Sequence, residues 1–290
     1  MLETLGHYKI LDRLGSSGSV EIYRARDTKL GRTVTIKVLP QDISRSLALR
    51  SQLLADARAA TALSHPNIAA LYEVGEEGDF AYLVCEYVPG EPLTAVIASH
   101  SLNVRRALDF ATQLADAVAD AHAEGIAHRN LRPTTVTVTP KEKVKILDFG
   151  FSAWMKRPGA TQPPLEDADF RADLAALGAI LYEMVTGRQP PSSSPPPPSA
   201  TNSNIPKELD LIVIKALNKP GDGQYESAAT LAAELRSVAA VLDVRSGDRE
   251  PPTNLPPRSE KKKPRIPTWV VIVLAGGLIA ALVWFAARTI

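Results

Sequence analysis

The spacing of the apolar residues changes near residue 88, and this change limits the folds that the chain can adopt. Before it, apolar and β-branched residues alternate with polar ones, as at Val34, Ile36 and Val38, which is the period of a half-buried strand. After it, apolar residues recur at helical spacing, most clearly over residues 103–124. This order predicts an α+β protein with a small β-rich lobe followed by a helical lobe.

The two spacings place the expected elements along the chain. In the first lobe, strands are expected at residues 8–14, 20–26, 32–39, 68–74 and 81–87, with one helix at 46–63. In the second lobe, helices are expected at residues 103–124, 173–186, 207–217 and 227–242. Gly125 and Gly187 follow two of these helices, where a glycine commonly ends a helix.

Two proline-rich stretches interrupt or follow this pattern. Residues 190–199 contain six prolines and predict a polyproline-type loop between two helices, because proline disrupts helices and central strands. An exposed linker is the favoured interpretation, and a ligand for a proline-binding domain is the alternative. Residues 243–267 are polar and proline-rich and predict a linker after the folded part.

Residues 268–287 form an apolar stretch of twenty residues without a charge, with Trp269 and Trp284 near its ends. A helix of about 20 residues spans about 30 Å of hydrocarbon, and tryptophan is typical of the membrane interface. A buried core helix is the less favoured alternative. The stretch therefore predicts one C-terminal transmembrane helix.

The charges around this stretch predict its orientation. Four basic residues lie in 261–265 and only Arg288 follows the span, which by the positive-inside rule places the N-terminal part in the cytoplasm. The first residues contain no signal-peptide pattern, so a tail-anchored protein is expected. Small residues four apart, such as Gly276 and Ala280, suggest a homodimer through the helix as a weaker hypothesis.

The composition excludes two further classes of protein. The net charge is +1 and no basic stripe with interleaved aromatic residues occurs in the folded part, so a nucleic-acid partner is not expected. Cys85 is the single cysteine, which excludes an intrachain disulfide framework and is consistent with a reducing compartment.

Several motifs then occur in a fixed order. They are a lysine in an apolar strand (33–39), Leu-Ser-His-Pro-Asn-Ile (63–68), Tyr-Leu-Val-Cys-Glu-Tyr-Val (82–88), His-Arg-Asn-Leu-Arg-Pro (128–133) and Asp-Phe-Gly (148–150). Together they resemble the eukaryotic-like serine/threonine protein kinases of bacteria. The resemblance covers residues 8–242 and implies a two-lobed protein-kinase-like fold, with an N-lobe at 8–88 and a C-lobe at 89–242.

The resemblance also implies where ATP and Mg²⁺ would bind. Lys37 would contact the phosphates and pair with Asp56, which replaces the usual glutamate of the regulatory helix. A solvent-facing helix aspartate is an equally weighted alternative for Asp56. The backbone from Glu86 to Val88 would hydrogen-bond the edge of adenine. Asp148 would hold one magnesium ion.

Next to the adenine position, Cys85 would be the gatekeeper residue. Thr35 replaces the usual alanine and would narrow the adenine pocket slightly.

The phosphate loop departs from the family pattern. Gly15 matches the first glycine of the G-x-G-x-x-G-x-V pattern, but Ser17 and Val20 replace the other two. Glycine lets the backbone approach a phosphate closely, which a β-branched residue resists. Gly18 lies one place off the pattern and is expected to compensate in part.

The catalytic loop departs at three positions. Asn130 replaces the aspartate that accepts the substrate proton, and Arg132 replaces the lysine that contacts the transferring phosphate. Thr135 replaces the asparagine that binds a second metal ion, and a hydroxyl is a poorer magnesium ligand. The segment after Gly150 contains no A-P-E-like motif. In the family the glutamate of that motif pairs with an arginine, and Gln224 occupies the position of this arginine.

These coordinated losses predict a pseudokinase that binds a protein partner in a signalling pathway and binds ATP weakly with one magnesium ion. A weakly active or atypical serine/threonine kinase is the enzyme alternative, because a dissociative transition state needs little help from a base. A nucleotide-independent interaction module is the third hypothesis.

Overall fold

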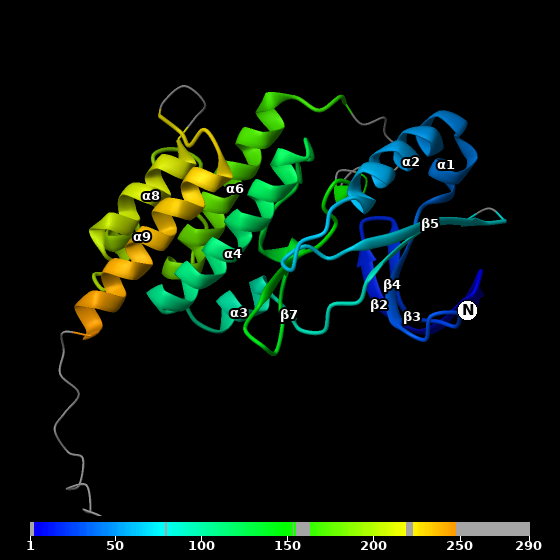
Figure 1. Cartoon of the computed structure of the whole chain (residues 1–290), viewed down its shortest axis with the longest axis horizontal. Coiled ribbons are helices and arrows are strands. Elements are labelled where there is room, and N and C mark those ends of the chain that lie inside the picture. The colour runs from blue at the N-terminus through cyan, green and yellow to red at the C-terminus, as the bar shows by residue number, and fades with distance from the viewer. Residues whose placement is uncertain (1–2, 79, 153, 155–162, 219–222, 248–290) are drawn as a thin grey trace, which may run out of the picture. The chain divides into compact units, whose positions relative to one another are not determined.

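The first lobe is built on a six-stranded antiparallel sheet (Figure 1), and the computed structural model describes residues 3–78, 80–152, 154, 163–218 and 223–247. The strand order is β1-β2-β3-β4-β6-β5. The strands are β1 (Thr4–Leu5), β2 (Tyr8–Ser17), β3 (Val20–Asp27), β4 (Thr33–Val38), β5 (Leu71–Glu77) and β6 (Phe80–Glu86). Helices α1 (Gln41–Arg45) and α2 (Leu47–Thr61) accompany the sheet.

Strand β4 shows why the alternating sequence forms this sheet. Val34 and Ile36 are fully buried in a cluster on one face, together with Tyr8 and Val84. Because successive side chains of a strand point to opposite faces, the residues on either side of Ile36, Thr35 and Lys37, point the other way. Lys37 is one of these residues, so the period of the strand carries it to the face that lines a pocket.

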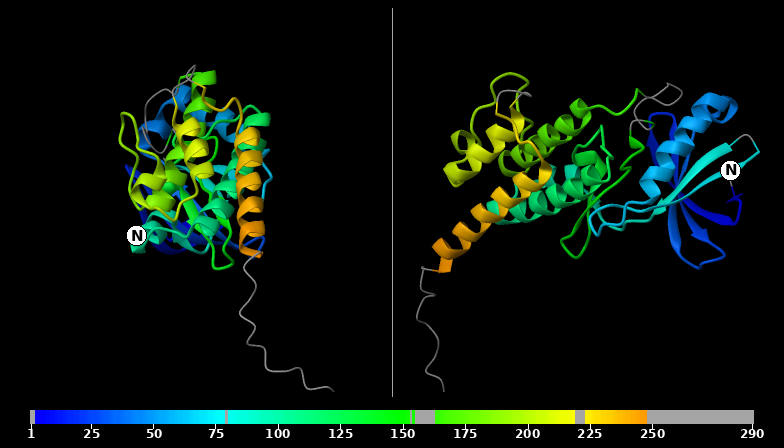
Figure 2. Two further views of the ribbon diagram at one scale, coloured as in Figure 1. Left: turned by 90° about the vertical axis from the view of Figure 1, so that its left-hand side faces the viewer. Right: turned by 45° about the horizontal axis from the view of Figure 1, so that its top comes forward.

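The second lobe begins with a small sheet and continues as a set of helices. Its sheet has the order β7-β8-β9, with β7 (Glu91–Pro92), β8 (Val136–Val138) and β9 (Val144–Ile146). The helices are α3 (Leu93–Ser99), α4 (Val104–Ala123), α6 (Asp167–Thr186), α7 (Pro198–Thr201), α8 (Lys207–Leu217) and α9 (Ala228–Gly247), with a short 3-10 helix η1 (Pro133–Thr135). Helix α9 packs along α4 (Figure 2).

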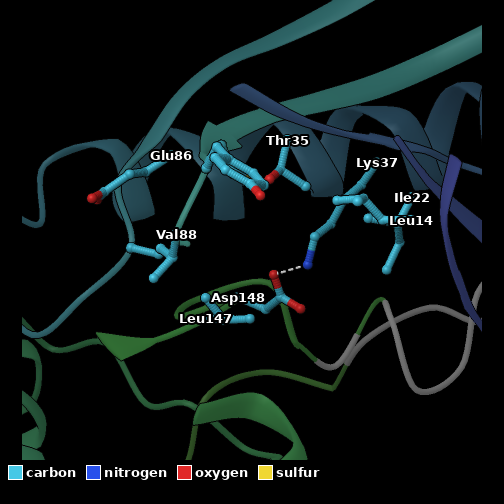
Figure 3. Close-up of a pocket in the computed structure, with 11 residues that line it drawn as sticks. Leu14, Ile22, Thr35, Lys37, Glu86, Val88, Leu147 and Asp148 are labelled. Carbon is cyan, nitrogen blue, oxygen red and sulfur yellow. Dashed lines mark hydrogen bonds and ion pairs between the residues drawn. The ribbon is translucent and has the colours of Figure 1, made fainter. Parts of the chain in front are cut away.

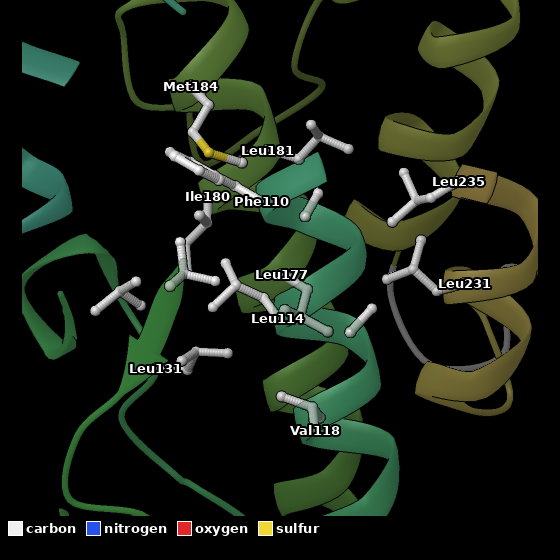
Figure 4. Close-up of a cluster of buried hydrophobic side chains, with 14 of the residues drawn as sticks. Phe110, Leu114, Val118, Leu131, Leu177, Ile180, Leu181, Met184, Leu231 and Leu235 are labelled. Carbon is white, nitrogen blue, oxygen red and sulfur yellow. The ribbon is translucent and has the colours of Figure 1, made fainter. Parts of the chain in front are cut away.

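Helix α4 lies at the centre of the helical core (Figure 4). Phe110 and Leu114 are at most 1% exposed and belong to the same cluster as Leu177 of α6 and Leu231 of α9. Burying a side chain of this size contributes about 1.5–3 kcal/mol. The helical period predicted over 103–124 is therefore confirmed by the side chains that α4 buries.

Some boundaries differ from the predicted ones for local reasons. Helix α6 begins at Asp167, six residues before the predicted start, because Asp169 accepts a hydrogen bond from the backbone N–H of Glu166 and caps the helix (3.0 Å). Helix α7 begins at Pro198, inside the predicted proline-rich loop, and ends two residues beyond it; proline is tolerated at the first helical position because it has no N–H to leave unpaired. Helix α9 continues to Gly247, so residues 243–247, which were predicted to belong to the linker, are helical.

In the described part of the chain, no helix is both long and apolar enough to cross a membrane. The predicted transmembrane helix at 268–287 and the predicted linker from residue 248 onward lie outside the described residues.

Candidate functional site

A pocket lies between the sheet of the first lobe and the loop that follows β9 (Figure 3). Leu14 and Ile22 line it on the sheet side, and Leu147 lines it on the opposite side. Thr35 and Cys85, which face each other on β4 and β6, also line it. Two apolar walls of this kind suit a flat aromatic base.

An ion pair occupies the polar end of this pocket. Lys37 is 5% exposed and its Nζ donates to Oδ1 of Asp148 (Figure 3). A buried ammonium group requires such a partner, because an unpaired charge in the interior is very costly. Asp148 has a left-handed φ of 64°, which is uncommon for residues other than glycine, asparagine and aspartate.

Asp56 has a different partner from the one that the sequence predicted. Its Oδ2 accepts a hydrogen bond from Nε1 of Trp154 at 2.8 Å, while Lys37 is paired with Asp148. The expected pair of Lys37 with Asp56 is therefore wrong for this structure. The reason is that Trp154 packs against α2 and its buried indole N–H needs an acceptor.

The connection after β6 is held by a second ion pair. The Glu86 carboxylate accepts from Nζ of Lys145 at 2.7 Å and from the backbone N–H of Ala70 at 3.2 Å. The backbone N–H of Glu86 donates to the carbonyl of Ala70 (2.8 Å), so neither its side chain nor its N–H is left for an adenine edge. Val88 lines the pocket beside it. Burial raises the pKa of the Cys85 thiol to about 12, so this wall of the pocket is uncharged.

The loop that contains Asn130 is anchored by Asp173 of α6. The carboxylate of Asp173 is 1% exposed and accepts the backbone N–H groups of His128 (2.6 Å) and Arg129 (2.9 Å). It also lies 3.0 Å from Nε2 of His122. These contacts hold Arg129 at a left-handed φ of 64°. The sequence analysis missed Asp173, although a lone acid within an apolar helical stretch is a signal for a buried polar role.

His128 joins this loop to the segment that contains Asp148. Its Nδ1 accepts the backbone N–H of Asn130 (3.2 Å), so the other ring nitrogen donates to the carbonyl of Leu147 (2.9 Å). Its ring also packs edge-on against Phe149. Burial lowers the pKa of His128, in agreement with the neutral form that these two bonds require.

Arg129 contacts α6 as well. Its Nη2 lies 3.1 Å from Oδ2 of Asp169, and its Nη1 donates to the carbonyl of Pro163 at 3.1 Å.

The other positions of the catalytic loop are engaged within the loop itself. The hydroxyl of Thr135 donates to the carbonyl of Arg132 at 2.9 Å and accepts the N–H of Arg132 at 3.2 Å. The Arg132 side chain is exposed, and Asn130 is half-buried. The carbonyl of Thr135 accepts the N–H of Leu147 (2.8 Å), which places Thr135 near Asp148, but its hydroxyl already serves as a cap for η1.

The turn between β2 and β3 contains the predicted phosphate-loop residues. Gly18 has a φ of +59° in the two-residue turn between Ser17 and Val20, a conformation that favours glycine. Gly15 lies at an irregularity in the pairing of β2 with β3. The Val20 side chain is fully buried in the cluster between the sheet and α2. The valine therefore contributes to the core of the lobe.

Gln224 fills the position where the family places an arginine. It is buried, and its Nε2 donates to the carbonyls of Arg171 (3.2 Å) and Ala216 (3.3 Å). Its Oε1 has no partner among the described residues. A neutral amide thus closes this part of the helical core without a buried charge.

Comparison with known proteins identifies the family. The family model for the protein kinase domain matches residues 8–237. The serine/threonine-protein kinase PknB of Mycolicibacterium smegmatis is 31% identical over 266 residues, and the serine/threonine-protein kinase PrkC of Bacillus subtilis is 29% identical over 262 residues. Each match covers 80% of this chain but only 43% of PknB and 40% of PrkC, so the chain spans about two fifths of these relatives.

Solved structures agree with this result. The crystal structure of a variant of the PknI kinase domain from Mycobacterium tuberculosis matches with a TM-score of 0.67 at 26% identity, over 81% of this chain and 97% of that one. Rad53 in complex with AMP-PNP matches with a TM-score of 0.65 over 79% of this chain and 64% of that one, and its 20% identity supports the fold alone. The chain belongs to the protein kinase domain family, and its relatives there include bacterial serine/threonine-protein kinases.

Proposed function

We propose that this chain is a membrane-anchored pseudokinase that binds a magnesium nucleotide and signals through a protein partner. The observation that supports this proposal most directly is the amide of Asn130, which stands where the family has its general base. An amide does not accept a proton at neutral pH. A positioned base contributes about 10²- to 10⁴-fold to a rate, so phosphoryl transfer without it would be slow at best.

The pocket supports the nucleotide part of the proposal. Its apolar walls suit a purine ring, and Lys37 offers the positive charge that a phosphate requires. One structural neighbour, Rad53, was solved in complex with AMP-PNP, an analogue of ATP. ATP is therefore the ligand that we assign to this pocket.

The donor set favours a single magnesium ion. The carboxylate of Asp148 is the hard oxygen ligand that Mg²⁺ prefers. The hydroxyl of Thr135 is engaged with Arg132, so it is poorly placed to bind a second ion. When bound, the ion would neutralise phosphate charge. Asp148 would hold it, and Lys37 would bind the phosphates.

Nucleotide binding can be measured as stabilisation of the full chain. Mg-ATP at 100 times its dissociation constant should raise the free energy of unfolding by about 2.7 kcal/mol. This corresponds to an increase in melting temperature of about 5–10 °C for a domain of this size. The matched control is Asp148→Asn, which should lose the magnesium-dependent part of the shift. A melting temperature that stays constant over rising Mg-ATP would remove ATP from the proposal and favour the nucleotide-independent module.

The alternative of a weak serine/threonine kinase is favoured by the retention of Lys37 and Asp148 and by the names of the relatives. Transfer of the labelled γ-phosphate to the chain itself and to a generic protein substrate distinguishes the two functions. We expect no transfer by the wild-type chain. We also expect none by Asn130→Asp alone, because that variant still has Thr135 in place of the asparagine that binds the second metal ion. Transfer by the wild-type chain that Lys37→Ala abolishes would overturn the pseudokinase proposal.

The membrane part of the proposal depends on residues 268–287. A lysine near the centre of a membrane span costs about 2.5–3.5 kcal/mol. Leu274→Lys combined with Leu278→Lys should therefore release the full chain from membranes on alkaline carbonate extraction, whereas the wild-type chain should stay in the pellet. Equal extraction of both chains would contradict the anchor. Gly276→Leu should weaken a helix-mediated homodimer in cross-linking, while leaving the anchor intact.

The proposal of a protein partner is supported by the intact two-lobed fold, which this chain forms although Asn130 and Thr135 replace the family's catalytic residue types. Proximity labelling from the membrane-bound full chain would identify that partner.

A further inference from the structure

Three apolar side chains are exposed together on helices α8 and α9. Leu211 of α8 is 74% exposed, and Val241 and Val244, one turn apart on α9, are 42% and 67% exposed. The two helices lie side by side at the end of the helical lobe that is farthest from the sheet of the first lobe (Figure 1). A single exposed leucine is ordinary, but an apolar patch with a polar rim marks a contact surface.

Two contacts between the helices place Leu211 and Val241 on one face. Lys215 of α8 pairs with Glu234 of α9 at 2.9 Å, and Glu208 of α8 lines a pocket together with Val241. Leu211 lies between Glu208 and Lys215 at helical spacing, and Val241 lies two turns after Glu234. The exposed apolar side chains of the two helices therefore face the same side.

A pocket of about 240 Å³ opens beside these side chains. Its walls include Pro206, before α8, and Val238, Val241 and Leu242 of α9. A cavity of about 150 Å³ holds a benzene molecule, so this pocket can hold a leucine side chain. The surface thus presents a projecting Leu211 next to a hollow. A two-fold symmetric pair needs this arrangement, because each copy then offers its leucine to the hollow of the other.

The chain that follows α9 would bring a second copy to this surface. Helix α9 ends at Gly247, and residues 248–267 connect it to the apolar stretch at 268–287. About twenty residues of flexible chain span about 25 Å on average and about 70 Å at most. If two such stretches pair in a membrane, a linker of this length gives the two surfaces an effective concentration in the mM range.

The size and charge of the surface suit a tethered copy better than a lipid surface. Anionic lipids attract clusters of lysine and arginine, but here Lys215 is paired with Glu234 and the pocket wall includes Glu208. The patch is small, and interfaces below about 1,200 Å² are typical of weak contacts. Tethering therefore supplies the strength that the area does not.

From these observations we infer that the α8–α9 surface, formed by Leu211, Val241, Val244 and the pocket beside them, pairs with the same surface of a second copy of this chain. Leu211 of each copy enters the pocket of the other. The inference rests on the proposed membrane anchor and helix-mediated homodimer. It goes beyond them, because it assigns the part of the folded domain through which the two copies meet.

Cysteine cross-linking of the purified full chain in phosphatidylcholine vesicles tests this pairing. Ser237→Cys places a thiol at an exposed position of the pocket wall, whereas the native Cys85 is buried. A short bis-maleimide should then give a species of twice the mass. In the same background Leu211→Glu should reduce the yield of that species about tenfold, because a carboxylate is costly to bury in an apolar pocket.

Leu30 provides the matched control. It is 68% exposed and lies in the turn between β3 and β4 of the first lobe. Leu30→Glu should leave the Ser237→Cys cross-link unchanged. Because Leu211 is exposed, Leu211→Glu should also keep the urea midpoint of wild type, and Val244→Glu repeats the test at a second exposed position.

A cysteine in the linker, Ser259→Cys, measures pairing of the apolar stretches separately. Loss of the Ser237→Cys cross-link in Leu211→Glu but not in Leu30→Glu supports the inference, and its loss in Gly276→Leu as well supports the role of the tether. Cross-linking at Ser259→Cys without cross-linking at Ser237→Cys overturns the inference and leaves the helix-mediated homodimer in place. So does a Ser237→Cys cross-link that Leu211→Glu leaves intact.

Two further results reach the proposed function as well. An anchored chain that cross-links at neither position overturns both the inference and the helix-mediated homodimer. Release of the chain from the vesicles by alkaline carbonate overturns the membrane anchor, and the inference with it.

Discussion

Replacement of Asp173 by asparagine should lower the free energy of unfolding by about 3 kcal/mol. The carboxylate is buried and satisfies two backbone N–H groups of the catalytic loop, those of His128 and Arg129, and it also contacts His122. Asparagine has one acceptor oxygen and one NH₂ group. If the oxygen stays opposite His128, the NH₂ group faces the N–H of Arg129, and two donors then meet without an acceptor.

The magnitude follows from the contacts that are lost. A hydrogen bond to a charged group contributes about 1.5–3 kcal/mol, and Asp173→Asn removes one such bond. The bonds that remain lose the charge of the acceptor, which makes each of them weaker. Asp173→Ala removes all three contacts and should cost about 5 kcal/mol, which corresponds to the lower end of three such bonds, because water can reach Arg129 in part.

Urea unfolding of the two variants measures this cost as a shift in midpoint at constant slope. Asp167→Asn on the same helix is the matched control, because Asp167 is exposed and its helix-dipole contribution is at most about 1 kcal/mol. Hydrogen exchange should also show faster exchange of the amides of His128 and Arg129. A cost below about 1 kcal/mol for Asp173→Asn, or unchanged protection of these amides, would refute the anchoring role.

Three further predictions follow from buried groups of the site. Asp148→Ala should lower the free energy of unfolding in urea by about 3–5 kcal/mol, because it leaves Lys37 buried without a partner. Adding Lys37→Met should restore most of this loss. If Asp148→Ala alone were as stable as wild type, the prediction would be contradicted. Burial lowers the pKa of His128 in the folded chain, so its contribution to the free energy of unfolding is complete above about pH 6.5. Below that pH the unfolded chain takes up a proton that the folded chain does not, and the free energy of unfolding falls by at most about 1.4 kcal/mol per pH unit. Urea unfolding at pH 7.5 and pH 5.5 should show this loss, and His128→Gln should reduce it; equal losses in both chains would count against it. Burial raises the pKa of Cys85 to about 12, so iodoacetamide at pH 8 should label the native chain far more slowly than the unfolded chain, and comparable labelling rates would show that the thiol is not enclosed.

Most elements could be predicted from the sequence because their signals are local. Helix α8 covers residues 207–217 and α4 covers 104–123, close to the predicted ranges, since each buries one face at helical spacing. The start of α6 could not be predicted in this way. It depends on a capping contact between Glu166 and Asp169, in a stretch without an apolar period.

The polar residues of the pocket were also accessible to sequence reasoning, whereas apolar lining residues such as Leu14, Ile22 and Leu147 were not predicted. Lys37 and Asp148 lie in motifs that resemble a known family, and the structure brings them together at one end of the pocket. Trp154 and Asp173 were missed because their roles depend on partners in other elements. A tryptophan or an aspartate has many uses, and only its surroundings distinguish them.

The sequence alone therefore determined the two lobes, their order and the positions of the residues that carry chemistry, because hydrophobic period and motif spacing are properties of neighbouring residues. Only the tertiary structure decided which groups pair. Lys37 and Asp148 are 111 residues apart, and Trp154 and Asp56 are 98 residues apart. A buried charge or donor pairs with the group that packing places within about 3 Å. Here Phe151 and Trp154 pack against α2, so the indole of Trp154 pairs with Asp56, and Lys37 pairs with Asp148.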